Sequence, residues 1–161
     1  TGVGFKYVAP KMMEIDAMLG GEESGGYAFR GNVPERDGIL GCLLFLDFMV
    51  KTGKKPSALL AWLFEKVGAH YYDRVDTVFP TAQRATVREK VAAARPGIQL
   101  GGLTVAQIDA TDGFKCVFEG GGWMLVRFSG TEPLIRVYCE VLQAERVQQV
   151  LAAGLKLAGL R

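Results

Sequence analysis

The chain has 161 residues, of which 49% are hydrophobic and 22% are charged, so it can form one sizeable globular domain or two small ones. Its formal net charge is +2, and the sequence has no basic run with interleaved aromatic residues, which argues against nucleic acid as a partner. The longest apolar stretch, residues 39–50, contains Asp47 and is too short to cross a bilayer core of about 30 Å, so we expect no membrane partner.

The first half of the chain combines a glycine-rich stretch, residues 20–31, with two segments whose apolar residues recur at helical spacing. Ser57 is the predicted N-terminal cap of the second helix. The predicted elements are helices at residues 37–53 and 57–68 and short strands at residues 15–19 and 27–30. Together they predict a partial α/β domain over residues 1–69, in which both helices cover a sheet.

The second half of the chain is richer in strand patterns. The predicted elements are strands at residues 70–79, 103–109, 114–118, 123–128 and 134–142, with helices at residues 81–94 and 144–158. One strand, one helix, several further strands and a final helix is the order of a small α+β domain. We therefore expect residues 70–161 to form a mostly antiparallel sheet with flanking helices.

The cysteines and the histidine offer little chemistry. Cys42, Cys116 and Cys139 lie in apolar surroundings without the C-x-x-C spacing, which predicts buried, reduced thiols in a cytoplasmic protein. A single histidine, His70, cannot build a site of several histidines, and we expect no metal site in this chain.

The motif R-F-S-G-T-E-P-L-I-R, residues 127–136, has the pattern of a strand that ends in a tight turn and restarts. Gly130 lets the backbone approach a ligand, and the turn amides can form a concave anion site. Ser129 and Thr131 add hydroxyl groups, and Arg127 precedes the turn. Arg136 follows the turn, and a guanidinium binds an oxyanion through two hydrogen bonds. The pattern therefore indicates an oxyanion site rather than an ordinary hairpin turn.

A second motif, G-G-E-E-S-G-G, predicts a loop whose backbone is open to a ligand. In an extended segment, Glu22 and Ser24 would face one side and Glu23 the other. A carboxylate acceptor beside a hydroxyl group suits neighbouring sugar hydroxyls. The alternative is a flexible acidic surface loop.

Two weaker segments accompany these motifs. T-G-V-G-F-K, residues 1–6, is a glycine turn before a helix, where backbone amides and Lys6 can serve an anion. Arg36 stands just before the helix that Asp37 is placed to cap. Arg36 is either a ligand residue or a solvated surface arginine.

In this order, T-G-V-G-F-K, G-G-E-E-S-G-G, E-R-D-G-I-L and R-F-S-G-T-E-P-L-I-R resemble the α-D-phosphohexomutase superfamily, and most of all phosphoglucomutases of the bacterial type. The resemblance covers nearly the whole chain. Members have four domains around one deep cleft, so the resemblance implies that residues 1–69 are the later part of the third, sugar-binding domain. Residues 70–161 would then be the fourth, phosphate-binding domain.

The resemblance also implies roles for individual residues. The sugar-binding residues would be Glu22, Ser24, Gly4, Lys6 and Arg36, and the residues that bind the distal phosphate would be Arg127, Ser129, Gly130, Thr131 and Arg136. Arg136 is assigned by its proximity to the turn more than by a motif match.

Two family motifs are absent from the chain: the T-x-S-H-N-P loop with the phosphorylated serine, and the D-x-D-x-D-R loop that holds Mg²⁺. The resemblance therefore implies a C-terminal portion with no catalytic residues, inactive on its own. The complete enzyme would be an isomerase of carbohydrate metabolism, an intramolecular phosphotransferase that interconverts hexose 1-phosphate and 6-phosphate. It would use Mg²⁺ and hexose 1,6-bisphosphate, whereas this portion would hold at most phosphate or sulfate.

The partners expected on the same basis are a phosphosugar and the N-terminal domains of the same chain. A domain that is cut after its first strand and helix leaves an open edge and an apolar face, so we also expect either self-association or disorder of residues 1–11. An alternative reading is a stand-alone, non-catalytic phosphosugar-binding module. Nucleic-acid binding by the antiparallel C-terminal sheet is a third and weaker alternative, because the net charge is close to neutral.

Overall fold

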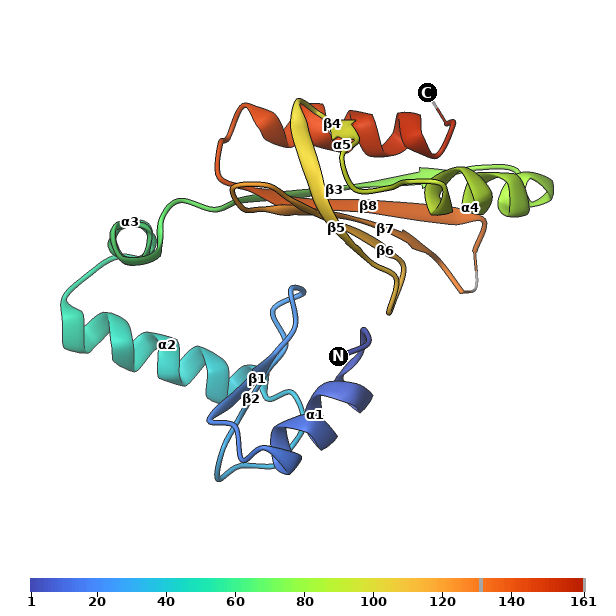
Figure 1. The fold of residues 1–161 in the computed structure, drawn as a ribbon. Helices are drawn as coiled ribbons and strands as arrows, with labels where there is room; N and C mark the ends of the chain where they lie inside the picture. The colour runs from blue at the N-terminus through green and yellow to red at the C-terminus, as the bar shows by residue number, and fades with distance from the viewer. Residues whose placement is uncertain (131, 161) are drawn as a thin grey trace. The chain divides into compact units, whose positions relative to one another are not determined.

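The computed structural model describes residues 1–130 and 132–160, and it divides the chain into two compact units, Thr1–Lys66 and Val67–Arg161 (Figure 1). The first unit is α/β, and the second is an α+β domain with an antiparallel sheet, which confirms the predicted fold class. No helix within the described ranges is long and apolar enough to cross a membrane.

The first unit is built around a short hairpin. Its elements are α1 (Phe5–Glu14), β1 (Leu19–Gly21), β2 (Tyr27–Phe29), α2 (Gly38–Thr52) and α3 (Pro56–Val67). The two strands pair antiparallel, with Leu19 opposite Phe29. Helix α1 packs against this hairpin and buries Phe5 and Met12 beside Ala28. This small core places the glycine-rich turn between β1 and β2 at the end of the hairpin.

Helix α2 begins and ends where its sequence signals predict. The Asp37 side chain accepts a hydrogen bond from the Leu40 amide at 2.8 Å, and Gly53 ends the helix with a φ of 64°. Although α2 is strongly apolar, none of its residues is buried. Its large exposed side chains, called here the apolar face of α2, are Ile39, Leu43, Leu44, Phe45, Leu46, Phe48 and Val50.

Three local predictions in the first unit are wrong. The first strand begins at Leu19, because the chain turns at Asp16, which has a φ of 50°. Helix α3 begins at Pro56, so Ser57 lies inside its first turn and is not the cap. Proline suits that first position because its missing N–H has no partner within a helix there. Cys42 is exposed rather than buried, because it lies on α2, a helix that buries none of its residues.

The second unit is a six-stranded antiparallel sheet with the order β3-β8-β7-β6-β5-β4. Its strands are β3 (Tyr71–Val78), β4 (Gln99–Leu100), β5 (Leu103–Asp109), β6 (Phe114–Phe118), β7 (Trp123–Phe128) and β8 (Leu134–Val141). Its helices are α4 (Arg84–Ala92), preceded by the 3-10 turn Thr81–Gln83, and α5 (Arg146–Leu157). The two-residue strand β4 is the only strand of this unit, among the described residues, that the sequence did not predict.

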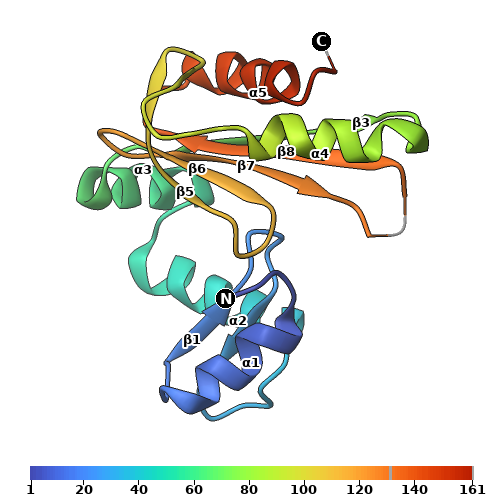
Figure 2. The same cartoon turned by 45° about the vertical axis from the view of Figure 1, so that its right-hand side comes forward.

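Helices α4 and α5 lie on the same side of this sheet (Figure 2). They cover a core of alternating strand residues, in which Val126 of β7 and Val137 of β8 pack with Val91 of α4 and Val150 of α5. Cys116 and Cys139 lie in this core, as predicted. Burial raises the pKa of both thiols, that of Cys139 to about 11. The helices therefore fix the sheet, and with it the turn between β7 and β8.

Candidate functional site

The glycine-rich loop of the first unit is a tight turn between β1 and β2. The Glu22 amide donates to the Gly26 carbonyl, and the Gly25 amide donates to the Glu22 carbonyl, both at 3.0 Å. Gly25 has a φ of 88°, in the region that favours glycine. The segment is therefore not extended. The alternation argument that placed Glu22 and Ser24 on one side is wrong, because hydrogen bonds within the turn replace the extended backbone.

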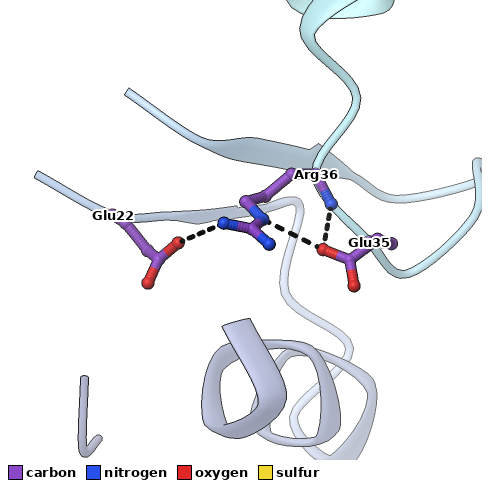
Figure 3. Close-up of polar contacts among 3 residues, drawn as sticks. All are labelled: Glu22, Glu35 and Arg36. Atoms are coloured by element: carbon purple, nitrogen blue, oxygen red, sulfur yellow. Dashed lines mark hydrogen bonds and ion pairs between the residues drawn. The ribbon is translucent and has the colours of Figure 1, made fainter. Parts of the chain in front are cut away.

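The Glu22 carboxylate lies against the guanidinium of Arg36 (Figure 3). The Glu22 side chain is only 11% exposed, and its Oε2 lies 3.6 Å from Arg36 Nη1. Glu35 Oε1 accepts hydrogen bonds from the Arg36 amide at 2.8 Å and from Arg36 Nε at 3.2 Å. These bonds, first that from the amide, hold the pKa of Glu35 below its ordinary value. Arg36 thus bridges two carboxylates and fixes the position of Glu22.

Arg36 reaches Glu22 because residue 26 is a glycine. A Cβ on Gly26 would lie 2.5 Å from Arg36 Cδ and 2.9 Å from Cγ, too close for any side chain without a shift of the arginine. The guanidinium also lies 5.7 Å from the centre of the Phe5 ring on α1. Arg36 therefore joins the turn to α1, a packing role that its place in the sequence did not reveal.

The other predicted sugar-site residues are Gly4, Lys6 and Ser24. Gly4 precedes α1 with a φ of 120°, so the glycine turn leads into a helix as predicted. The Lys6 amine lies 4.9 Å from the centre of the Tyr7 ring. Within the described part of the chain, neither Lys6 nor Ser24 forms a hydrogen bond or ion pair with Glu22 or Arg36. The sugar-binding roles of Gly4, Lys6 and Ser24 remain predictions.

In the second unit, the turn from β7 to β8 is closed by its own hydrogen bonds. The Ser129 amide donates to the Leu134 carbonyl at 2.9 Å, and Ser129 Oγ accepts from the Glu132 amide at 3.2 Å. Ser129 is only 7% exposed. Its carbonyl accepts a hydrogen bond from Arg84 Nη2 at 2.7 Å, which ties the turn to α4. Gly130 is exposed, and Thr131 lies outside the described residues.

Arg127 and Arg136 are direct neighbours across β7 and β8, so their side chains leave the sheet on the same side. Each has a carboxylate partner. Arg127 Nε lies 3.1 Å from Asp112 Oδ1, and Arg136 Nε lies 3.3 Å from Asp76 Oδ2. The hydrogen bond with Asp76 is the main cause that raises the pKa of Arg136. Arg127 is partly enclosed, with 25% of its side chain exposed.

Next to the β7–β8 turn lies a polar concavity of about 320 Å³. Its lining includes Arg127 and Asp112, together with Arg84 and Arg88 of α4. The sequence analysis missed these two arginines. Their spacing of four residues within a predicted helix places both on one face, and this was the available signal.

Comparisons with known proteins identify the family of the chain. Residues 1–67 match the profile of phosphoglucomutase/phosphomannomutase, alpha/beta/alpha domain III, and residues 81–156 match the C-terminal domain of the same proteins. The chain belongs to the phosphoglucomutase/phosphomannomutase family. This family membership confirms the resemblance that the four sequence motifs indicated.

Named members of the family are similar along nearly all of the chain. A phosphoglucomutase/phosphomannomutase of Thermococcus kodakarensis is 36% identical over 98% of the chain and 32% of its own length. A phosphoglucosamine mutase of Leuconostoc mesenteroides is 34% identical over 92% of the chain and 28% of its own length. The chain thus spans about a third of the length of the curated relatives it matches.

The fold is similar to that of a solved phosphoglucomutase/phosphomannomutase family protein from Burkholderia thailandensis. The TM-score is 0.68 at 20% identity, over 98% of this chain and 32% of that one. The relatives are phosphomutases by name, and phosphoglucosamine mutases are among them. Among the residues that the structure describes, no three potential metal ligands gather in one place.

Proposed function

We propose that this chain is the C-terminal portion of a phosphohexomutase and supplies sugar recognition and distal-phosphate recognition. The complete enzyme would interconvert hexose 1-phosphate and hexose 6-phosphate as an intramolecular phosphotransferase. The observation that carries the proposal is the arginine-lined concavity beside the β7–β8 turn, in a chain of this family. The names of the relatives support a hexose or aminohexose phosphate as the substrate class.

Phosphoryl transfer depends mainly on positioning the reactants and stabilising the charge of the transferring group. The second unit would hold the phosphate that does not react. Arg127, kept in place by Asp112, would bind the phosphate oxygens through its remaining N–H groups. The Ser129 amide already donates to the Leu134 carbonyl, so Gly130 is the described residue whose amide we expect to donate to the phosphate.

The first unit would hold the sugar. The Glu22 carboxylate, largely enclosed and fixed by Arg36, would accept hydrogen bonds from two neighbouring hydroxyl groups. The nearby Arg36 guanidinium compensates part of the negative charge of Glu22. Mg²⁺ would be held by other parts of the complete enzyme, since the described residues offer no metal-binding cluster. Hexose 1,6-bisphosphate would be bound by the complete enzyme, with this chain contributing the contacts to the sugar and to the distal phosphate.

The test is an NMR titration of the 161-residue chain with inorganic phosphate, with sodium chloride at equal ionic strength as the control. We expect the Gly130 amide to shift with a millimolar dissociation constant, or about −4 kcal/mol. Arg127→Ala should abolish the shift. The matched control is Arg74→Ala, because Arg74 pairs with Asp76 on β3 and does not line the concavity.

Two outcomes would contradict the proposal: a Gly130 amide that stays unchanged, or equal loss of the shift in the Arg127 and Arg74 variants. A coupled assay with glucose 1-phosphate, glucose 1,6-bisphosphate and Mg²⁺ is the second test. We expect no turnover by the isolated chain, and turnover above background in a chain purified free of host enzyme would show that catalytic groups are present here.

A further inference from the structure

Two arginines on α4 face the concavity without a carboxylate partner. Arg84 and Arg88 are four residues apart, and among the described residues neither forms an ion pair. Each guanidinium instead lies over an aromatic ring, Arg84 at 5.6 Å from the centre of Phe128 and Arg88 at 5.7 Å from that of Phe114. Such stacking limits the motion of a guanidinium while its N–H groups at the edge stay able to donate.

The concavity as a whole therefore carries positive charge. Arg84, Arg88 and Arg127 contribute three positive charges against the single negative charge of Asp112, a formal excess of +2. Positive groups that gather around one hollow raise the local concentration of anions. A phosphate monoester carries about −1.5 to −2 charges at pH 7 and matches this excess better than a carboxylate or a phosphodiester, which carries one negative charge.

We propose that Arg84 and Arg88 are the α4 wall of a phosphate-monoester subsite that continues from the β7–β8 turn. Arg88 binds phosphate oxygens directly. Arg84 is a positioning residue, because its hydrogen bond of 2.7 Å to the Ser129 carbonyl sets the distance between the turn and α4. This inference rests on the proposed function, since the turn forms one side of the same site, but it adds two residues from a different element.

The experiment follows the arginine Nε–Hε signals of the 161-residue chain while inorganic phosphate is added. We expect the signals of Arg84, Arg88 and Arg127 to shift together with the Gly130 amide and to give one dissociation constant. Arg88→Ala should weaken binding on the order of tenfold, as expected for loss of hydrogen bonds to a charged group. The matched control is Lys90→Ala, which removes the same charge from the same helix outside the concavity.

Arginine-to-lysine variants keep the positive charge, so they distinguish a role in positioning the turn from an effect of lost charge or of a disrupted fold. Arg88→Lys keeps the charge and should restore most of the affinity. Arg84→Lys keeps the charge but not the planar guanidinium, so it should weaken binding about as much as Arg84→Ala and alter the Gly130 amide signal before phosphate is added. Glucose 6-phosphate should bind at least as tightly as inorganic phosphate, and a dinucleotide, as a phosphodiester, should bind much more weakly.

The results that would refute the α4 wall differ from those that would refute the proposed function. If Arg127→Ala abolishes binding while Arg88→Ala binds like Lys90→Ala, the turn binds phosphate and the α4 wall does not. If the Arg84 variants bind like the wild-type chain, Arg84 has no positioning role. If phosphate shifts none of these signals, the proposed function fails together with the subsite.

Discussion

Gly154 of α5 lies where the helix crosses the sheet, and replacing it with alanine tests the packing that holds the phosphate-binding unit together. A Cβ at this position would lie 2.6 Å from Val137 Cγ1 and 2.8 Å from Met124 Sδ, and both residues are fully buried. Carbon atoms pack best about 3.5–4.0 Å apart, so the helix or the valine must shift by about 1 Å. Such overpacking costs about 1–3 kcal/mol, against a gain of about 0.5–1 kcal/mol in helix propensity.

We therefore expect Gly154→Ala to lower the free energy of unfolding by about 1.3 kcal/mol, the difference between the midpoints of these two ranges. For a domain of about 100 residues this corresponds to a fall in Tm of about 5–10 °C. The chain has two tryptophans, Trp62 in α3 and Trp123 in β7. Fluorescence of a Trp62→Phe background therefore reports unfolding of the second unit alone.

The control uses the valine that the new methyl group would strike. Val137→Ala alone should destabilise the second unit by leaving a small cavity. Val137→Ala combined with Gly154→Ala should be more stable than the sum of the two single losses, because the added methyl group then occupies that cavity. An alanine at 154 that leaves the chain as stable as before, or strict additivity of the two changes, would refute the packing argument.

Further predictions concern the first unit. In the complete enzyme, Glu22→Gln should lower kcat/KM by the equivalent of about 1.5–3 kcal/mol, and Glu23→Gln, at an exposed turn position, should change it far less. At pH 8, Cys42 should react with a thiol reagent in the native chain, and the two buried cysteines only after denaturation. Hydrogen bonds, first that from the Leu40 amide, lower the pKa of Asp37 in the folded chain. The stabilisation of the helix by Asp37 is therefore present above the pKa of the unfolded state and is lost as the pH falls through the pKa of the folded state. Asp37→Asn should weaken the pH dependence of the helix signal in circular dichroism. The apolar face of α2 should cause concentration-dependent association in sedimentation experiments.

The sequence predicted the second unit well because its signals are local. Alternating apolar residues between glycine turns define the bounds of β5, β6 and β7, and the predicted ranges match the structure residue for residue. The strand β4 has only two residues, and a two-residue strand has no alternation that a sequence can display. Local periodicity thus predicts long helices and strands, but it fails for very short strands that form only by pairing with an adjacent strand.

The candidate sites were predicted less completely, because they depend on contacts between distant residues. A glycine-rich segment is compatible with both an extended loop and a tight turn, and the hydrogen bond from the Glu22 amide to the Gly26 carbonyl decides between them. The contact of Arg36 with Glu22 depends on the space above Gly26, which the sequence does not display. Arg84 comes close to the β7–β8 turn only because α4 packs against the sheet, and the two segments are 45 residues apart in the sequence.

The two sites differ in how much they depend on the rest of a larger enzyme. The β7–β8 turn is fixed within the second unit by the pairing of the two strands and by the hydrogen bonds of Ser129. One of these bonds comes from Arg84 of α4, a helix that packs on the core of the same unit. The glycine-rich turn between β1 and β2 is supported by its two-stranded hairpin and by Arg36, and the buried core of the first unit is small. Binding at each site is limited by the cost of ordering its groups. We therefore expect phosphate binding to persist in the isolated chain, and sugar binding to require the complete enzyme.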